Sequence, residues 1–136
     1  MIPGPGRSGS IVPGKSRFSS LAPTIVTKGG DPHIVLGAPG GTQIAIGLLQ
    51  AIINVIDFDM TMLEAVSAPR FSSTSNIIDV TNRIPEYKTH DLERQDYKVV
   101  RSPSPFSIAA VHGIRIIDGK MDGSADPSYD GAALAI

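Results

Sequence analysis

The clearest pattern of apolar and polar positions surrounds a glycine-rich turn, Gly37-Ala38-Pro39-Gly40-Gly41. The residues that lead into it, His33–Ala38, are mostly apolar and predict a strand. From residue 42 to residue 57 the positions are mostly apolar, with Gln50 and Asn54 as a narrow polar stripe, which predicts a helix. A helix that is apolar on most sides is covered on more than one side, so we expect a layer on each face of it.

A second apolar run, Thr24–Lys28, lies just before this strand. Gly29-Gly30-Asp31-Pro32 separates the two, and these residue types form tight turns, so the runs predict an antiparallel hairpin. If residue 28 pairs with residue 33, Ser20 lies opposite Gly41. The hairpin therefore predicts that the two serines at 19–20 and the two glycines at 40–41 meet at one end of a sheet.

Shorter elements follow. Met62–Ala68 is expected to be a helix, because Thr61 and Glu64 match a capping box and Pro69 ends the pattern. The order of elements, with a hairpin and a final meander, indicates an α+β fold with antiparallel sheets. We further expect a helix over Pro85–Gln95, a loop over residues 122–131, and strands near Asn76–Val80, Tyr97–Arg101, Phe106–Val111 and Ile114–Asp118.

Composition is that of one globular domain. The chain has 136 residues, of which 41% are hydrophobic and 18% are charged. Residues 1–16 are rich in Gly, Pro and Ser and predict an extended, flexible arm, which leaves residues 17–136 as the folded part. The net charge of −1 gives no electrostatic basis for binding nucleic acid or an anionic membrane surface.

Several classes of site are excluded by composition. The chain has no cysteine, which excludes disulfides, zinc–thiolate sites and thiol catalysis but is compatible with any cellular compartment. The apolar run at 44–56 is shorter than the ~20 residues that cross a bilayer, and the first residues lack the apolar core of a signal peptide. His33, His90 and His112 have no metal-ligand spacing, so we expect neither a metal nor a cofactor.

Candidate chemistry is concentrated at the glycine turn. A turn that opens a buried helix presents the backbone N–H groups of Gly40 and Gly41 to negative charge. A nucleotide-binding P-loop would need a lysine after the second glycine, which is absent here. Ser19 and Ser20, carried there by the hairpin, would add two hydroxyl donors for a carboxylate. No nucleophile in a recognisable context accompanies them, so these residues make half of a catalytic site.

Several segments, in order along the chain, resemble the C-terminal part of the small subunit of gamma-glutamyltranspeptidase, an N-terminal nucleophile hydrolase. Pro13–Thr24 is similar to the family's PGKRPLSSMSPT, and Leu36–Thr42 to its LGSPGGS. Asn54–Phe58 and Glu64–Phe71 resemble parts of NVIDFGMDLQEAVDAPRF. The end of the chain, Gly123–Gly131, resembles GASDPRxDG.

The resemblance implies a fold and a site. The fold would be part of an αββα four-layer sandwich, with antiparallel sheets and one buried central helix. Ser19 and Ser20 would hold the α-carboxylate of a gamma-glutamyl donor such as glutathione, and the N–H groups of Gly40 and Gly41 would form the oxyanion hole. The family's nucleophilic threonine, in a TTH context, and its acidic MDDF stretch are not among these residues, and Ser128 stands where many members have arginine.

We therefore expect a fragment of a gamma-glutamyltransferase or glutathione hydrolase that is inactive alone and needs the large subunit or the rest of the enzyme chain. Many members of the family are periplasmic or extracellular. Two alternatives stay open: a non-enzymatic remnant that binds a small carboxylate or another chain, and a related amidohydrolase with a different amide substrate. The apolar helix also predicts exposed apolar surface and a tendency to oligomerise in isolation.

Overall fold

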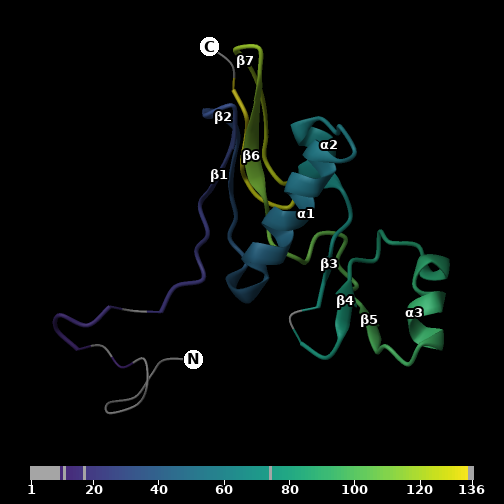
Figure 1. The fold of residues 1–136 in the computed structure, drawn as a ribbon. Coiled ribbons are helices and arrows are strands. Elements are labelled where there is room, and N and C mark those ends of the chain that lie inside the picture. The colour runs from purple at the N-terminus through teal and green to yellow at the C-terminus, as the bar shows by residue number, and fades with distance from the viewer. Residues whose placement is uncertain (1–9, 11, 17, 74, 135–136) are drawn as a thin grey trace.

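The computed structural model describes residues 10, 12–16, 18–73 and 75–134, and contains two sheets (Figure 1). The main sheet has the strand order β1-β2-β6-β7, with bounds Thr24–Lys28, Asp31–Gly37, His112–Ile117 and Lys120–Ser124. The second sheet has the order β3-β4-β5, with bounds Phe71–Ser72, Ile78–Val80 and Val99–Arg101.

The predicted N-terminal arm lies largely outside the described residues, because positions 1–9 and 11 are not among them. The described residues 12–16 contain a turn, in which the N–H of Lys15 donates to the carbonyl oxygen of Val12 at 3.1 Å. The flexibility expected of the arm therefore stays a prediction.

β1 and β2 form the predicted antiparallel hairpin, but their register differs from the expected one. Lys28 pairs with Asp31, whereas the prediction paired it with residue 33. The turn is only two residues long, Gly29–Gly30, and both residues have positive φ, which glycine adopts without strain. The register then shifts by one residue between Val26 and Thr27, where His33 of β2 is the extra residue.

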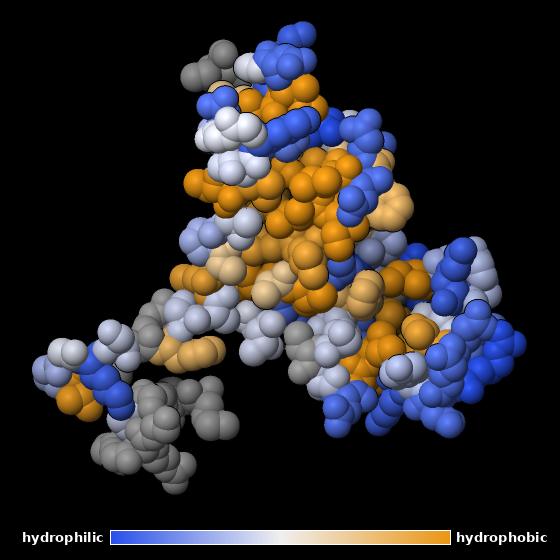
Figure 2. Space-filling model, in the orientation of Figure 1, coloured by the Kyte–Doolittle hydropathy of each residue, from blue (hydrophilic) through white to orange (hydrophobic). Residues whose placement is uncertain are grey.

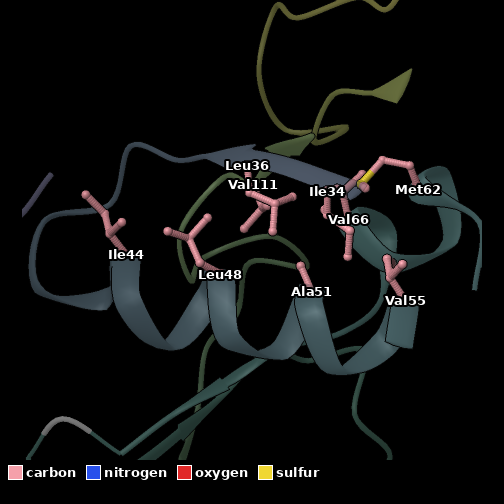
Figure 3. Packing of buried hydrophobic residues seen from close by; sticks show 10 residues of the cluster. Ile34, Leu36, Ile44, Leu48, Ala51, Val55, Met62, Val66 and Val111 are labelled. Atoms are coloured by element: carbon pink, nitrogen blue, oxygen red, sulfur yellow. The ribbon is translucent and has the colours of Figure 1, made fainter. Parts of the chain in front are cut away.

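Helix α1, Ile44–Ile56, follows the short 3-10 helix η1, Gly41–Gln43, and packs on the main sheet. Gln50 lies on another side of α1 and exchanges two hydrogen bonds with the backbone of Phe71 in β3, at 2.8 and 3.1 Å. The helix is therefore tied to both sheets. Its sheet-facing side chains and their partners form the buried core (Figure 3): Ile44, Leu48, Ala51 and Val55 lie against Ile34, Leu36, Met62, Val66 and Val111.

Helix α2, Met62–Ser67, begins with the predicted capping box. The backbone N–H and the hydroxyl of Thr61 both donate to the carboxylate of Glu64 at 2.8 Å, and the N–H of Glu64 donates back to the hydroxyl at 3.3 Å. These bonds lower the pKa of Glu64 below its usual value. The bond from the backbone N–H of Thr61 has the larger effect, and the bond from its hydroxyl the smaller. Asp122 of β7 accepts a further bond from the N–H of Met62 at 2.8 Å, so the last strand also caps this helix.

The second sheet is only partly antiparallel. β3 pairs antiparallel with β4, but β4 and β5 are parallel, which corrects the expectation of antiparallel sheets throughout. The helical segment between them explains the difference, because a crossover of this kind returns the chain in the same direction. The structure divides that predicted helix into η2, Glu86–Lys88, and α3, His90–Arg94.

Two expected elements near the C-terminus are wrong. Residues 106–111 are irregular although a strand was expected, and Ala109 within them has a positive φ of 39°, which does not occur in a strand. Part of the expected loop at 122–131 belongs to β7. Asp118 and Gly119 both have positive φ, as a two-residue hairpin turn requires, and this turn folds β7 back onto β6.

The predicted exposed apolar surface is confirmed. Figure 2 shows apolar side chains gathered over the region of α1 and α2, and there Leu49, Ile56 and Leu63 are about half exposed. Ile25 and Ile114 are exposed on the face of the main sheet that is turned away from α1. The described residues thus form an α+β fold with α1 and α2 on one face of the main sheet and apolar side chains on the other.

Candidate functional site

The glycine loop, residues 37–41, joins β2 to the first helical turn before α1. Gly40 has φ 147° and Gly41 has φ 59°, a pair of conformations that residues with a Cβ rarely adopt. Both residues are exposed. The loop therefore presents backbone, rather than side chains, at the N-terminal end of the helical segment.

The N–H groups of Gly40 and Gly41 are available to a ligand. Among the hydrogen bonds of the described residues, none is donated by either group. The loop is held by other bonds: the N–H of Gln43 donates to the carbonyl oxygen of Gly40 at 3.2 Å, and that of Ala110 donates to Pro39 at 3.1 Å. Free amides at a helix start attract negative charge, so this geometry can stabilise an anion or a developing oxyanion.

The irregular segment 106–111 sets the position of the glycine loop. A Cβ added to Gly40 would lie 2.8 Å from the Cα of Ala109. A Cβ added to Gly47 in α1 would lie 2.7 Å from the Cβ of Ala109. Neither position has room for a side chain. The glycine at position 40 is therefore required both by its own φ and by the close approach of Ala109.

Ser19 and Ser20 lie before β1. The pairing of β1 with β2 ends at Thr24 and Leu36, so the two serines and the glycine loop leave the main sheet at the same end. Ser19 is exposed and its hydroxyl accepts a bond from the N–H of Leu21 at 3.2 Å, while Ser20 is half-buried. Within the described residues no hydrogen bond joins either serine to the glycine loop, and their convergence on it stays a prediction.

A buried polar cluster is centred on Arg70, for which the sequence indicated an ion-pair role without identifying the partner. The guanidinium of Arg70 forms an ion pair with Asp126 and donates to the carbonyl oxygens of Val66 at 2.7 Å and Ile108 at 2.9 Å. The other carboxylate oxygen of Asp126 accepts bonds from the N–H and hydroxyl of Ser128 at 2.9 and 2.6 Å. The partners are far apart in sequence, so no local pattern signals the cluster. It joins α2, the 106–111 segment and the C-terminal loop.

Two of the three histidines have structural partners, and the third, His90, is exposed. Nδ1 of His112 accepts a bond from the N–H of Asp126 at 3.3 Å, and its ring lies edge-on to Tyr129. Nδ1 of His33 donates to the carbonyl oxygen of Ile116 at 2.9 Å. In the part of the chain that the structure describes, no group of three His, Cys, Asp or Glu residues is placed to hold a metal ion. No helix in that part is long and apolar enough to cross a membrane.

A hollow of about 690 Å³ lies between α3 and the second sheet. Its walls are mostly apolar and include Phe71, Ile78, Val80, Leu92 and Tyr97. It shares no lining residue with the glycine loop and contains no pair of groups suited to acid–base or nucleophilic chemistry. The candidate chemistry of the described residues is therefore at the glycine loop.

Known proteins match this chain in sequence. The family model described as gamma-glutamyltranspeptidase matches residues 4–136. The acylase ACY 1 proenzyme of Pseudomonas sp. (strain V22) is 39% identical over 138 residues, which cover 98% of this chain and 24% of that protein. The glutathione hydrolase proenzyme of Bacillus subtilis is 32% identical over 135 residues, which cover 97% of this chain and 23% of that protein.

Solved structures share the fold. A mutant of Helicobacter pylori gamma-glutamyltranspeptidase is similar with a TM-score of 0.79 and 34% identity, over 88% of this chain and 67% of that chain. The Pseudomonas nitroreducens gamma-glutamyltranspeptidase complexed with L-DON is similar with a TM-score of 0.81 and 26% identity, over 96% of this chain and 69% of that chain. The chain thus spans about a quarter of the length of the curated proteins named above. Since the family match covers nearly all of its residues, the chain belongs to the gamma-glutamyltranspeptidase family.

Proposed function

We propose that this chain supplies the oxyanion hole of an amidohydrolase or acyltransferase that acts on gamma-glutamyl amides such as glutathione. The observation that carries the proposal is the pair of unbonded N–H groups at Gly40 and Gly41, at the N-terminal end of the helical segment that contains α1. Negative charge develops on the carbonyl oxygen when an amide is attacked, and preorganised N–H donors stabilise it. Losing one such donor typically lowers the rate about 10²–10³-fold.

Ser19 and Ser20 are proposed to bind the α-carboxylate of the donor. Their position at the same end of the main sheet as the glycine loop supports this role. A carboxylate held by two hydroxyls beside the oxyanion hole would fix the donor by its far end while its amide carbonyl faces Gly40 and Gly41. The nucleophile would be the threonine that the family carries in a TTH context, contributed by residues outside this stretch.

The rest of such an enzyme is proposed to pack on the exposed apolar faces. Leu49 and Ile56 on α1 and Ile25 and Ile114 on the main sheet leave apolar surface on two sides, which supports a missing layer on each. A layer on the free face of the main sheet would give the two face-to-face sheets of the αββα sandwich that the family resemblance implied. The proenzyme names of the relatives are compatible with a longer polypeptide as the source of these layers.

A second candidate is an acylase that cleaves a different amide. Identity to the acylase ACY 1 proenzyme is 39% over 98% of this chain, against 32% over 97% for the Bacillus subtilis glutathione hydrolase proenzyme. In a gamma-glutamyl enzyme the contact to the donor α-amino group would come from the family's acidic MDDF stretch, which is not among these residues. A matched pair of anilides that differ only in that amino group, gamma-glutamyl and glutaryl, therefore distinguishes the two candidates.

The proposal is tested by anilide turnover. The chain is assayed with gamma-glutamyl-4-nitroanilide alone and after co-production with the polypeptide that carries the threonine nucleophile. We expect no turnover alone and turnover in the complex. Turnover by the chain alone that survives repurification would contradict the expectation that the chain is inactive without its partner. A complex that forms but cleaves neither anilide would refute the enzymatic role and leave the non-enzymatic remnant.

The role of the serines is tested in the active complex. Losing a hydrogen bond to a charged group costs about 1.5–3 kcal/mol, so Ser20→Ala should raise KM about 10- to 100-fold with a smaller change in kcat. Ser16→Ala, an exposed serine in the same segment, is the matched control and should leave both constants unchanged. Equal effects of the two changes would exclude the serines from the donor site.

A further inference from the structure

The hollow between α3 and the second sheet stays open because the helix beside it is short. Ile78 and Val80 of β4 point to the same face of the sheet, and Phe71 of β3, which pairs with Val80, points there too. α3 has five residues, His90–Arg94, and Leu92 is the apolar one that lines the hollow. Protein interiors are normally close-packed, but this helix contributes too little apolar volume to fill the space. About 690 Å³ therefore stays unfilled, and Figure 2 shows apolar atoms in this part of the molecule with hydrophilic residues around them.

The walls of the hollow are fixed by hydrogen bonds that need no ligand. The N–H of Tyr97 donates to the carbonyl oxygen of Leu92 at 3.1 Å, which ties the end of α3 to the residues that lead into β5. Arg101 of β5 donates to the carbonyl oxygen of Ile84 and, at 3.3 Å, to the hydroxyl of Thr89. All of these partners of α3 and β5 line the hollow except Arg101 itself. The space is therefore preformed.

The charged groups at the hollow are positive. Lys88 lines it and is exposed, and its ammonium lies 5.4 Å from the centre of the Tyr87 ring. The half-buried guanidinium of Arg101 bonds to two of the wall residues. Among the ion pairs of the described residues, none includes Lys88 or Arg101, and no described residue that lines the hollow carries a carboxylate. Unpaired cations beside an apolar wall favour an anion there, because water and salt screen charge less in a recessed space.

We infer that this hollow binds a fatty-acid-like monocarboxylate. The apolar chain lies against Phe71, Ile78 and Leu92, and the carboxylate faces Lys88. Small-molecule sites are typically hollows of about 300–1,000 Å³ with apolar walls and a few polar groups that orient the ligand. A cavity of about 150 Å³ holds the six carbons of benzene, so a hollow of about 690 Å³ that is open on one side has room for roughly ten to sixteen carbons.

The inference does not depend on the proposed function, because the hollow shares no lining residue with the glycine loop. The other candidate occupant is a segment of the longer polypeptide. A recessed, preformed space with cations at its wall suits a small anion, whereas the open apolar faces of α1 and the main sheet suit another layer of protein. The experiment below separates the two occupants.

Binding is measured by isothermal titration calorimetry at pH 7 on the 136-residue chain. The probes are decanoate and decyltrimethylammonium, which share a ten-carbon chain and carry opposite charges, both used below the concentrations at which they form micelles. Ile78→Trp fills the hollow. Val100→Trp is its matched control, because Val100 is exposed and pairs with Asp79, on the opposite face of the same sheet.

Charge is tested with a second matched pair. Lys88→Glu reverses the charge at the hollow, and Lys98→Glu makes the same change at an exposed position that does not line it. Leu49→Gln removes an exposed apolar side chain of α1 and controls for adsorption of the probes to that surface. Melting curves confirm that each variant is folded. If Ile78→Trp does not fold, the two lysine variants decide the outcome.

We expect decanoate to bind the parent chain and the Val100→Trp, Lys98→Glu and Leu49→Gln variants with the same Kd. It should bind Ile78→Trp at least about tenfold more weakly, because two or more methylene groups lose their apolar contact. Lys88→Glu should weaken decanoate at least about threefold. Decyltrimethylammonium should bind the parent more weakly than decanoate does, and Lys88→Glu should strengthen its binding.

Two results would overturn the inference in the chain itself. One is an unchanged Kd for decanoate in folded Ile78→Trp, and the other is an equal effect of Lys88→Glu and Lys98→Glu. The titration is repeated on the complex with the polypeptide that carries the nucleophile, where the same Kd is expected. Loss of decanoate binding in that complex would assign the hollow to a segment of the partner polypeptide and would also overturn the inference.

Discussion

The buried ion pair between Arg70 and Asp126 gives the most direct test of how this fold is held together. Both residues are buried, with relative exposures of 3% and 0%. Replacing Arg70 by Met keeps a long apolar stem but removes the charge. Asp126 then keeps only the two donors of Ser128, and the carbonyl oxygens of Val66 and Ile108 lose their partner.

The expected loss of stability is large. Removing one member of a buried ion pair costs about 3–5 kcal/mol, because the other charge stays buried without compensation. That is a large share of the roughly 5–15 kcal/mol that stabilises a domain. Asp126→Leu should cost a similar amount by the same reasoning. The double variant removes both charges, so it should cost less than the two single changes together by at least about 2 kcal/mol.

The assay is urea unfolding followed by far-UV circular dichroism, with free energies of unfolding taken from linear extrapolation. The exposed pair of Arg94 and Asp91 is the matched control, and Arg94→Met should cost less than about 1 kcal/mol. A cost for Arg70→Met no larger than that of the control would refute this account of the cluster. So would additive effects in the double variant.

Three further predictions concern other parts of the fold. Gly40→Ala should lower the melting temperature more than Gly29→Ala, because both have positive φ but only the former meets backbone within 3 Å; equal shifts would contradict the contact with the 106–111 segment. The hydrogen bonds from Thr61 lower the pKa of Glu64, so their stabilisation is complete above the usual pKa and is lost as pH falls through the lowered value. Unfolding measured from pH 6 to pH 3 should show this loss in the parent and less of it in Glu64→Gln. Leu49→Gln should reduce binding of an apolar dye while changing the free energy of unfolding by no more than about 0.5 kcal/mol.

The features that the sequence predicted correctly have local causes. The capping box of α2 needs only Thr61 and Glu64, three positions apart, and its hydrogen bonds are present as expected. Helix α1 is marked by its apolar run, and the hairpin by two glycines between β-forming residues. The family resemblance was confirmed because it rested on several ordered segments rather than on one glycine motif.

The features that were missed depend on contacts between distant residues. Whether β7 forms is decided by its pairing with β6, and its composition of Lys, Asp, Gly and Ser indicated a loop. The apolar residues at 106–111 resemble a strand, but they are buried against the glycine loop and α1 rather than paired in a ladder. The pairing of Arg70 with Asp126 spans 56 positions, and no spacing rule covers it.

The placement of β2 in the middle of the main sheet also determines when the domain can fold. Ile34 pairs with Val26 nearby in the chain but with Arg115 on its other side, and the first amide of α2 meets its acceptor, Asp122, 60 residues later. During synthesis the N-terminal hairpin must therefore wait, with one edge of β2 unpaired, until residues 112–124 have been made. Through that interval it is a template for mispairing with other nascent chains. Translation speed and chaperone access across the intervening residues should consequently govern the yield of folded protein.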